Sequence, residues 1–231
     1  MGKIHFIGGE KGGVGKSVVA RLLAQYFIDH KIPFVALDAD ASHPALVRHY
    51  EESSERVSLS DPSGLDPVAE RALEQDLRAL VDLPAQSADT VHAWIESGDL
   101  LEFARENEVA VCHWHVTDGG YDSVRLLGAL AERYAKHTGY VVVRNHGRSR
   151  DFSQLAVSEE LAAIQALGAQ VIDLPDLDAG VMYRIDRHGS SFWAAIHDHT
   201  SELRLPVLDR RRVRKWLEAC FREIDALGEL L

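Results

Sequence analysis

A glycine-rich run close to the start of the sequence constrains the fold more than any other feature. The run GGEKGGVGKS, from Gly8 to Ser17, contains five glycines and ends in a Lys-Ser pair. The apolar run 3–7 ahead of it predicts a strand, and apolar residues spaced three and four apart over 18–30 predict a helix. Glycines between a strand and a helix let backbone N–H groups point inward and bind an anion at the helix N-terminus. The sequence therefore predicts a phosphate-binding loop.

The two side chains that close this loop suit a nucleotide bound with magnesium. A lysine at the position of Lys16 reaches the β- and γ-phosphates, and the hydroxyl of Ser17 is a ligand for Mg²⁺. The residues expected to contact the nucleotide phosphates are Gly12, Gly13, Val14, Gly15, Lys16, Ser17 and Val18.

Strand-like and helix-like segments alternate along the rest of the chain. This pattern is typical of an α/β fold in which a mostly parallel sheet carries helices on both faces. The 231 residues, 46% of them hydrophobic and 26% charged, fit one such domain over 1–231. The polar stretch 41–64 is expected to be loop with a short strand at 57–59, followed by a helix capped by Asp66. Further strands are expected at 34–37, 77–81, 109–116, 140–143 and 171–174, and further helices at 90–95, 99–107, 122–137 and 154–167 and over much of 181–231.

Cysteine content and apolar patterning bear on the compartment. Cys112 and Cys220 are far apart and form no CxxC motif, so we expect a reducing cytoplasm and no metal cluster. The N-terminal residues lack the apolar core of a signal peptide. No apolar stretch approaches the ~20 residues of a membrane span.

The glycine loop has a second lysine, and with it the chain resembles a known family. The form K-G-G-x-G-K-S, with Lys11 ahead of the loop, resembles the deviant Walker A ATPases of the MinD/ParA family over about 1–177. The resemblance implies a P-loop ATPase that binds ATP and Mg²⁺. In that family the early lysine crosses a nucleotide-sandwich homodimer to the partner's ATP, so Lys11 implies ATP-dependent dimerisation. A cation supplied by a second subunit stabilises the transferring phosphoryl group only after the two subunits have met.

Acidic residues at strand ends match the family's two switch segments. Asp38 and Asp40 match D-x-D of switch I, with Asp40 expected to orient the attacking water and Asp38 to lie near magnesium. Both could instead be turn-forming residues after a strand. For switch II, the DPSG run at Asp61 and the DLPAQ run at Asp82 are both candidates. We prefer Asp82, acting on Mg²⁺ through water, although Gln86 stands where the family usually has glycine.

The base pocket is also expected from the resemblance. Asn145, at the end of a predicted strand, matches the asparagine that reads adenine, and Pro175 lies in the segment that would supply the other edge of the pocket. An asparagine at a strand end can equally be a turn residue.

The run CHWH at 112–115 invites a metal site, which we do not predict. Strand alternation puts His113 and His115 on one face and Cys112 and Trp114 on the other, and no further ligands can be identified. Core or hydrogen-bonded histidines are the better interpretation.

Near the C-terminus an apolar stripe and a group of arginines suggest different partners. Residues 213–231 place their apolar side chains on one helical stripe with a mixed, partly acidic polar face, which favours packing on the domain over binding a membrane. The basic group could bind DNA without sequence preference, as in ParA-like proteins, or could be a solvated face, because the net charge of −11 opposes DNA binding. The basic residues are Arg210, Arg211, Arg212, Arg214 and Lys215.

Several functions stay open within this family. The stretches 2–5, 80–86 and 115–120 resemble ParA-like proteins of the TraL type, which implies an ATP-switched accessory to plasmid transfer with an unidentified protein partner. Plasmid partition is the near alternative, and a membrane-cycling positioning protein is a further one. The cysteine count excludes the bridging cluster of nitrogenase iron protein. Nothing marks a small-molecule substrate such as that of dethiobiotin synthetase.

Overall fold

A parallel sheet forms the centre of the molecule. The computed structural model describes residues 2–61, 63–74 and 77–231. Within these residues a seven-stranded sheet has the order β3-β2-β4-β1-β5-β6-β7, and every neighbouring pair is parallel. The strands are β1 Lys3–Gly8, β2 Phe34–Asp38, β3 Ser54–Arg56, β4 Arg78–Asp82, β5 Ala110–Thr117, β6 Gly139–Asn145 and β7 Gln170–Leu174. The fold class is the one expected from the alternating pattern.

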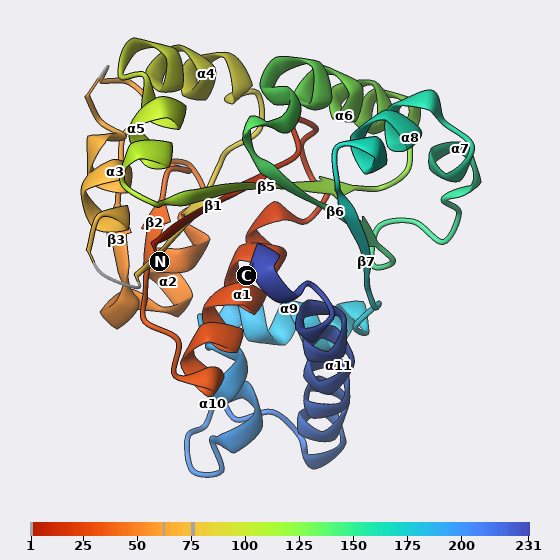
Figure 1. Cartoon of the computed structure of the whole chain (residues 1–231). Helices are drawn as coiled ribbons and strands as arrows, with labels where there is room; N and C mark the ends of the chain where they lie inside the picture. Colours follow the sequence, from red (N-terminus) through yellow and green to blue (C-terminus); the bar gives the residue numbers. More distant parts are fainter. Residues whose placement is uncertain (1, 62, 75–76) are drawn as a thin grey trace.

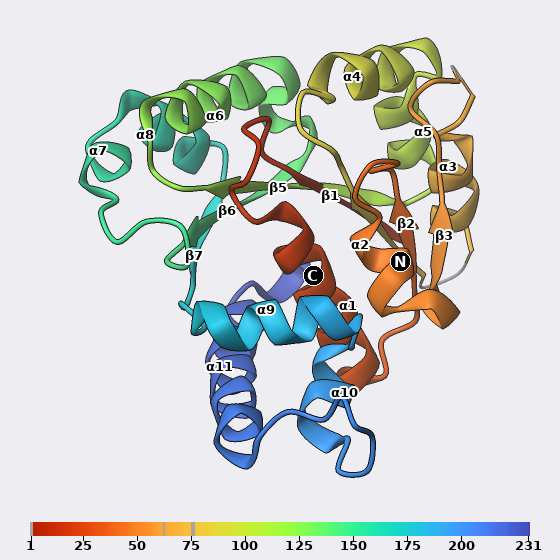
Figure 2. The same cartoon turned by 180° about the vertical axis from the view of Figure 1, so that it is seen from behind.

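Helices cover both faces of this sheet, as Figures 1 and 2 show from opposite sides. One face carries α1 Lys16–His30, α2 Ala45–His49, α9 Ala179–His188, α10 Phe192–His197 and α11 Val207–Asp225. The other face carries α3 Asp66–Ala72, α4 Ala88–Ser97, α5 Leu100–Glu106, α6 Tyr121–Tyr134, α7 Ser153–Ala156 and α8 Glu159–Ala166. Each face has its own apolar core, so the strands are buried on both sides, as parallel sheets require.

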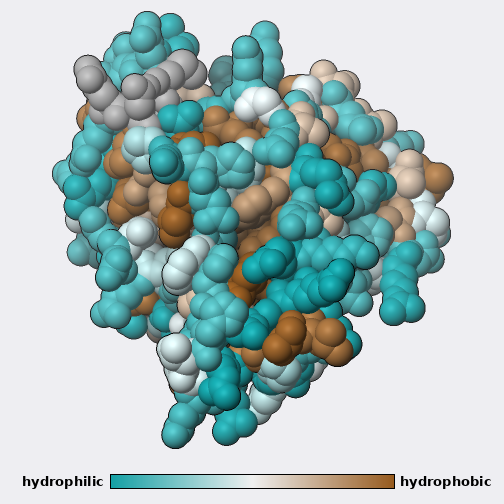
Figure 3. Space-filling view, turned by 90° about the horizontal axis from the view of Figure 1, so that it is seen from below, coloured by the Kyte–Doolittle hydropathy of each residue, from teal (hydrophilic) through white to brown (hydrophobic). Residues whose placement is uncertain are grey.

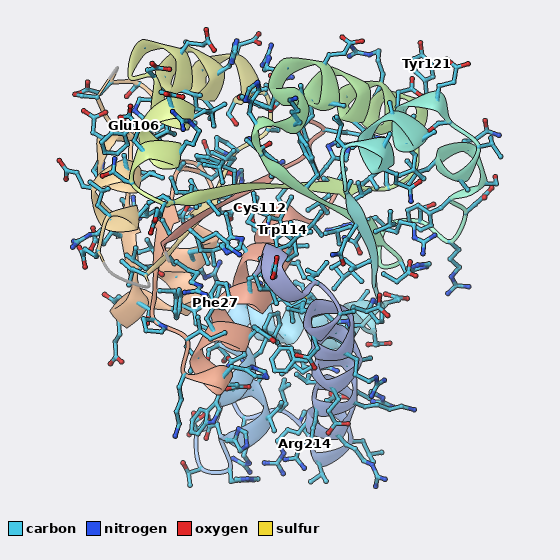
Figure 4. The ribbon with its side chains drawn as sticks, viewed as in Figure 1. Phe27, Glu106, Cys112, Trp114, Tyr121 and Arg214 are labelled. Atoms are coloured by element: carbon cyan, nitrogen blue, oxygen red, sulfur yellow. The ribbon has the colours of Figure 1, made fainter. Side chains whose placement is uncertain are left out.

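Strand β5 shows how alternation divides its side chains between the two cores. Cys112 and Trp114 belong to the core beneath α1 and α11, and Figure 4 shows them on that side of the sheet. His113 faces the opposite layer, where its ring stacks on Phe6 at 5.3 Å and on Tyr134 at 4.4 Å between centroids. The prediction that this histidine belongs to the core is confirmed.

The C-terminal helix α11 packs against the body of the protein through its apolar stripe. Val213, Trp216, Leu217, Cys220 and Ile224 are all buried against α1, α10 and β7, which confirms the packing interpretation. No helix among the described residues is both long and apolar enough to cross a bilayer.

The region between β2 and α3 differs from the expectation. The short strand is Ser54–Arg56 rather than 57–59, because polar side chains are tolerated where this strand forms the sheet's edge beside β2. The expected loop also contains α2, whose first turn donates backbone N–H groups of Leu46 and Val47 to the Asp38 carboxylate. A cap supplied from a distant strand end leaves no local sequence signal.

Two helix boundaries also differ. Asp66 is not the cap of α3 but its first residue, and its carboxylate accepts the Trp94 indole N–H at 2.9 Å. The single helix expected at 154–167 is two helices, because the Ser158 hydroxyl accepts the Leu161 N–H and caps a new helix, α8.

Four histidines lie inside the structure and are held neutral. Burial lowers the pKa of His5 and His113 to about 3, and of His49 and His115 to about 4, with nearby cations adding to the shift at His5 and His49. Below pH 6.5 the unfolded chain binds protons at these positions while the folded chain does not. The folded state therefore loses stability as the pH falls from about 6.5 towards 4.

Replacing one of these imidazoles should flatten that dependence. In His113→Phe, the stability measured by urea unfolding should fall less steeply between pH 6.5 and 4, by up to about 1.4 kcal/mol per pH unit. His43→Phe is the matched control, because His43 is exposed in the folded chain. An unchanged slope in His113→Phe would contradict the burial of an unprotonated ring at this position.

Candidate functional site

The glycine loop joins β1 to α1 in a conformation that only glycine accepts at its last turn. Gly15 has φ 103°, and its carbonyl accepts the N–H groups of Val18 and Val19 at 3.1 and 3.2 Å. A Cβ at this glycine would lie 2.2 Å from Nδ2 of Asn145. The loop is therefore closed tightly over the start of α1, where helix N–H groups and the positive end of the helix dipole favour an anion.

Lys16 is the first residue of α1 and lies across the loop. It is buried, and its Nζ donates to the Lys11 carbonyl at 3.4 Å. Burial lowers its pKa, while Asp82, Glu10 and Asp40 oppose the shift through their negative charge. The ammonium group is thus held over the loop without a close carboxylate partner among the described residues, as a phosphate-binding cation requires.

Asp82 is the acidic residue that the sheet brings to the loop. Strand pairing sets it beside Ile7 of β1, and the following residue, Leu83, donates its N–H to the Ile7 carbonyl at 3.1 Å. The side chain is fully buried, and neither carboxylate oxygen has a hydrogen-bond partner among the described residues. Burial raises its pKa to about 7, and the nearby Ser17 hydroxyl and Lys16 ammonium oppose that shift.

An unpartnered buried carboxylate facing a serine hydroxyl fits a hydrated magnesium ion. Mg²⁺ is usually held by one or two carboxylates together with substrate phosphates and water, rather than by a full protein cage. Among the described residues no group of three or more His, Cys, Asp or Glu side chains could hold a metal ion.

Asp61, the alternative to Asp82, lies elsewhere. It is in an exposed turn after the edge strand β3, where its carboxylate accepts the N–H and hydroxyl of Ser63 at 3.0 Å. Pro62 of this DPSG run lies outside the described residues. The structure therefore places Asp82, and not Asp61, next to the glycine loop.

The two aspartates after β2 have different surroundings. Both oxygens of Asp38 accept main-chain N–H groups, from Asp40 on one side and from Leu46 and Val47 on the other. Asp40 is half-buried, and its Oδ1 accepts the N–H groups of Ser42 at 3.0 Å and His43 at 2.9 Å. Asp38 thus organises the segment, whereas Asp40 keeps Oδ2 available for water.

Lys11 is held within its own chain by Asp118. The two side chains form an ion pair of 2.6 Å, with 37% and 22% of the side chains exposed. A hydrogen bond from Lys11 helps to lower the pKa of Asp118 against the opposing effect of burial, and the same bond raises the pKa of Lys11. The lysine is therefore near the surface and can exchange this partner for another anion.

A cavity lies beside the loop at the ends of β6 and β7. It has a volume of about 250 Å³, and its lining includes Val18, Asn145, Pro175 and Asp176. The Asn145 amide donates to the Val14 carbonyl at 2.7 Å, and Gly147 N–H donates to its oxygen at 3.0 Å. One amide hydrogen stays available for a base in this cavity.

The backbone conformation at Gln86 explains why the family that the sequence resembles usually has glycine at this position. Gln86 has φ 59°, the left-handed region in which glycine carries no steric penalty. Its side chain is exposed, so the chain tolerates glutamine here at a backbone cost of about 1–2 kcal/mol.

Three contacts at the site were not expected from the sequence. Glu10 binds backbone N–H groups at the start of α4, Asp118 pairs with Lys11, and the Trp216 indole donates to the Pro175 carbonyl at 2.7 Å. Asp118 belongs to a stretch that the resemblance had singled out, but no chemistry suggested its partner. Trp216 is 41 residues from Pro175 in the sequence, and its place on an apolar helical stripe gives no sign of this contact.

The chain is similar in sequence to two known proteins. It is 26% identical to protein MobD of Acidithiobacillus ferrooxidans over 219 residues, which cover 92% of each chain. It is 23% identical to protein TraL of Escherichia coli over an alignment of 250 residues that spans both chains completely. No family model matches the sequence.

A solved structure shares the fold. The MinC:MinD cell division protein complex of Aquifex aeolicus contains a chain that aligns with a TM-score of 0.55 and 14% identity, covering 96% of this chain and 97% of the other. The chain thus has the fold of that MinD chain, with a glycine loop and a strand-end aspartate at one edge of the parallel sheet. In sequence it is related to TraL and MobD over nearly its whole length.

Two glycines of the loop should respond differently to an added methyl group. Gly15→Ala should lower the free energy of unfolding by about 2 kcal/mol or more, because the new Cβ clashes with Asn145 at a positive φ. Gly12→Ala is the matched control, since a Cβ there meets nothing within 4 Å, and it should stay within about 0.5 kcal/mol. Equal stability of the two variants in urea unfolding would contradict this loop geometry.

Proposed function

We propose that the chain is an ATP-dependent molecular switch, one ATPase domain over 1–231 that binds Mg·ATP and hydrolyses it slowly until a partner stimulates it. The observation that carries this proposal is the buried, unpartnered carboxylate of Asp82 beside the glycine loop and Ser17. A glycine loop alone binds anions, but an ionised acidic residue beside it repels a phosphate unless a cation lies between the two.

The proposed roles follow from the position of each side chain. The loop N–H groups, from Gly12 to Val18, bind the phosphates and Lys16 neutralises their charge. Ser17 and Asp82 would hold magnesium, with Asp38 shaping the segment nearby. When bound, Mg²⁺ neutralises charge on the β- and γ-phosphates.

The free oxygen of Asp40 suits it to orient the water that attacks the γ-phosphate. Asn145 and Pro175 are proposed to hold adenine in the cavity beside the loop, which commits the site to ATP.

Lys11 is proposed to act across a homodimer. Its ammonium pairs with Asp118 near the surface of its own chain, rather than with a group of its own glycine loop. Water near the surface weakens the attraction within this ion pair, so a partner's ATP phosphates can replace Asp118. Dimerisation would then complete the catalytic set of Lys11, Lys16 and Asp40.

Removing this lysine should separate nucleotide binding from dimerisation. Lys11→Ala should bind ATP within about twofold of the parent, because the lost contact lies across the interface, yet stay monomeric and inactive. Sizing chromatography with a non-hydrolysable ATP analogue measures the dimer, and Lys136→Ala, at another exposed lysine, is the control. A Lys11→Ala protein that dimerises and turns over like the parent would contradict the sandwich mechanism.

The cellular role proposed is an accessory to plasmid DNA transfer or mobilisation in the cytoplasm, with a protein partner still to be identified. It is supported by the similarity to TraL and MobD over nearly the whole chain. The alternative is partition or positioning of a plasmid. A pull-down that recovers a relaxase, rather than a protein that binds a partition site, would contradict this alternative.

A basic surface on the N-terminal half of α11 makes DNA a candidate partner. Arg211, Arg214 and Lys215 are exposed, and none of them takes part in an ion pair among the described residues. By contrast, Arg212 pairs with Asp209, and Arg210 donates to the Asp198 carbonyl. Figure 4 shows Arg214 at the tip of the molecule, and Figure 3 shows a mainly hydrophilic underside broken by small apolar areas.

If this surface binds DNA, binding should depend on both salt and nucleotide. Two copies in an ATP-bound dimer should bind duplex DNA without sequence preference, while monomers should bind poorly. With ~3–5 phosphate contacts per copy, affinity should fall with a slope of about −0.9 per contact in logarithmic salt concentration.

The test is a gel shift at two salt concentrations with a trapped ATP state. Replacing Arg211, Arg214 and Lys215, which form no ion pair among the described residues, with glutamate should remove binding and spare ATP affinity. The charge-matched control replaces the exposed residues Arg56, Arg150 and Arg222. Equal binding in the ATP and ADP states, or none in either, would leave these arginines as a solvated face.

A further inference from the structure

Glu10, inside the glycine loop, caps a helix that lies far from it in the sequence. Its Oε1 accepts the backbone N–H groups of Ser87 at 3.2 Å and Ala88 at 2.9 Å. These two groups begin α4, and in the described structure α4 has no side-chain cap from its own N-cap residue. A carboxylate at this position satisfies orphan donors and complements the positive end of the helix.

The segment between Asp82 and α4 is tied to the loop strand at three points. Leu83 N–H donates to the Ile7 carbonyl at 3.1 Å, and Gln86 N–H donates to the Glu10 carbonyl at 3.3 Å. The Glu10 side chain supplies the third attachment, at the start of the helix. Hydrogen bonds therefore link the glycine loop directly to the segment that follows Asp82.

A further ion pair extends this connection to the molecular surface. Asp89, the residue after Ala88, pairs with Arg133 of α6 at 2.7 Å. A cavity of about 270 Å³ lies between α4 and α6, and Glu10 and Ala88 are part of its lining. The first turn of α4 thus has room beside it, and its displacement would alter how α4 sits against α6.

We propose that Glu10 is a positioning residue that transmits the state of the phosphate loop to α4. A bound phosphate draws the loop N–H groups inward, which moves the Glu10 main chain and with it the cap on Ser87 and Ala88. The start of α4 then differs between the ATP and ADP states, and α4 and α6 carry that difference to a surface that a partner can contact. This inference rests on the proposed function, because it needs a nucleotide in the loop.

Hydrogen exchange at the start of α4 tests the relay in the full-length chain. In Glu10→Ala without nucleotide, the amides of Ser87 and Ala88 should exchange about five- to tenfold faster than in the parent, because the cap is lost. The parent should show different exchange at these amides with ADP and with a non-hydrolysable ATP analogue, and Glu10→Ala should lose that difference. Its turnover should fall while its KM for ATP stays within about twofold.

Glu10→Gln separates positioning from charge. The glutamine amide oxygen can accept the same two bonds, so the nucleotide-dependent exchange should return to near the parent's. Glu106→Ala, at the exposed glutamate of α5 labelled in Figure 4, is the control and should behave like the parent.

Three results would overturn the relay. They are parent-like exchange in Glu10→Ala, a nucleotide-dependent difference that persists in that variant, and Glu10→Gln behaving like Glu10→Ala. Failure of the proposed function gives a different pattern. In that case the parent binds no ATP by calorimetry and its exchange is the same with and without nucleotide, so the relay falls with it.

Discussion

The parallel pairing of β1 with β4 is the constraint on which the site depends. It sets Asp82 beside Ile7, one residue before the glycine loop begins, and buries the carboxylate without a hydrogen-bond partner in the described chain. A buried charge without a partner is costly, and its pKa is raised to about 7. The arrangement becomes favourable when a cation lies between this aspartate and a phosphate. The strand order thus brings the acidic residue close enough to the glycine loop for their charges to interact.

Much of the fold could be predicted from local patterns in the sequence. Apolar runs located the strands that are buried on both faces, such as β6 around Val142, and the spacing of Val213, Trp216 and Cys220 placed α11 against the core. Local patterns failed where a distant residue decides the structure. Asp38 caps α2 from the end of β2, and the edge strand at Ser54–Arg56 carries polar side chains that alternation cannot identify.

The candidate site was predictable in part for the same reason. The glycine loop, Lys16 and Ser17 are continuous in sequence, so the motif locates them. The partners of Lys11 and Glu10 are 107 and 77 or 78 residues away, and no pattern in the sequence brings them together. Gln86 is a further case, because its left-handed backbone explains the family's glycine only after its φ is known.

Isothermal titration of ATP, with magnesium present, into the parent and into Lys16→Ala tests whether the glycine loop is the nucleotide site. We expect one nucleotide per parent chain and no measurable binding in Lys16→Ala, because the variant loses the buried cation over the loop while keeping the fold. Omitting magnesium should weaken binding to the parent. Unchanged ATP affinity in Lys16→Ala would contradict the assignment of the loop as the nucleotide site.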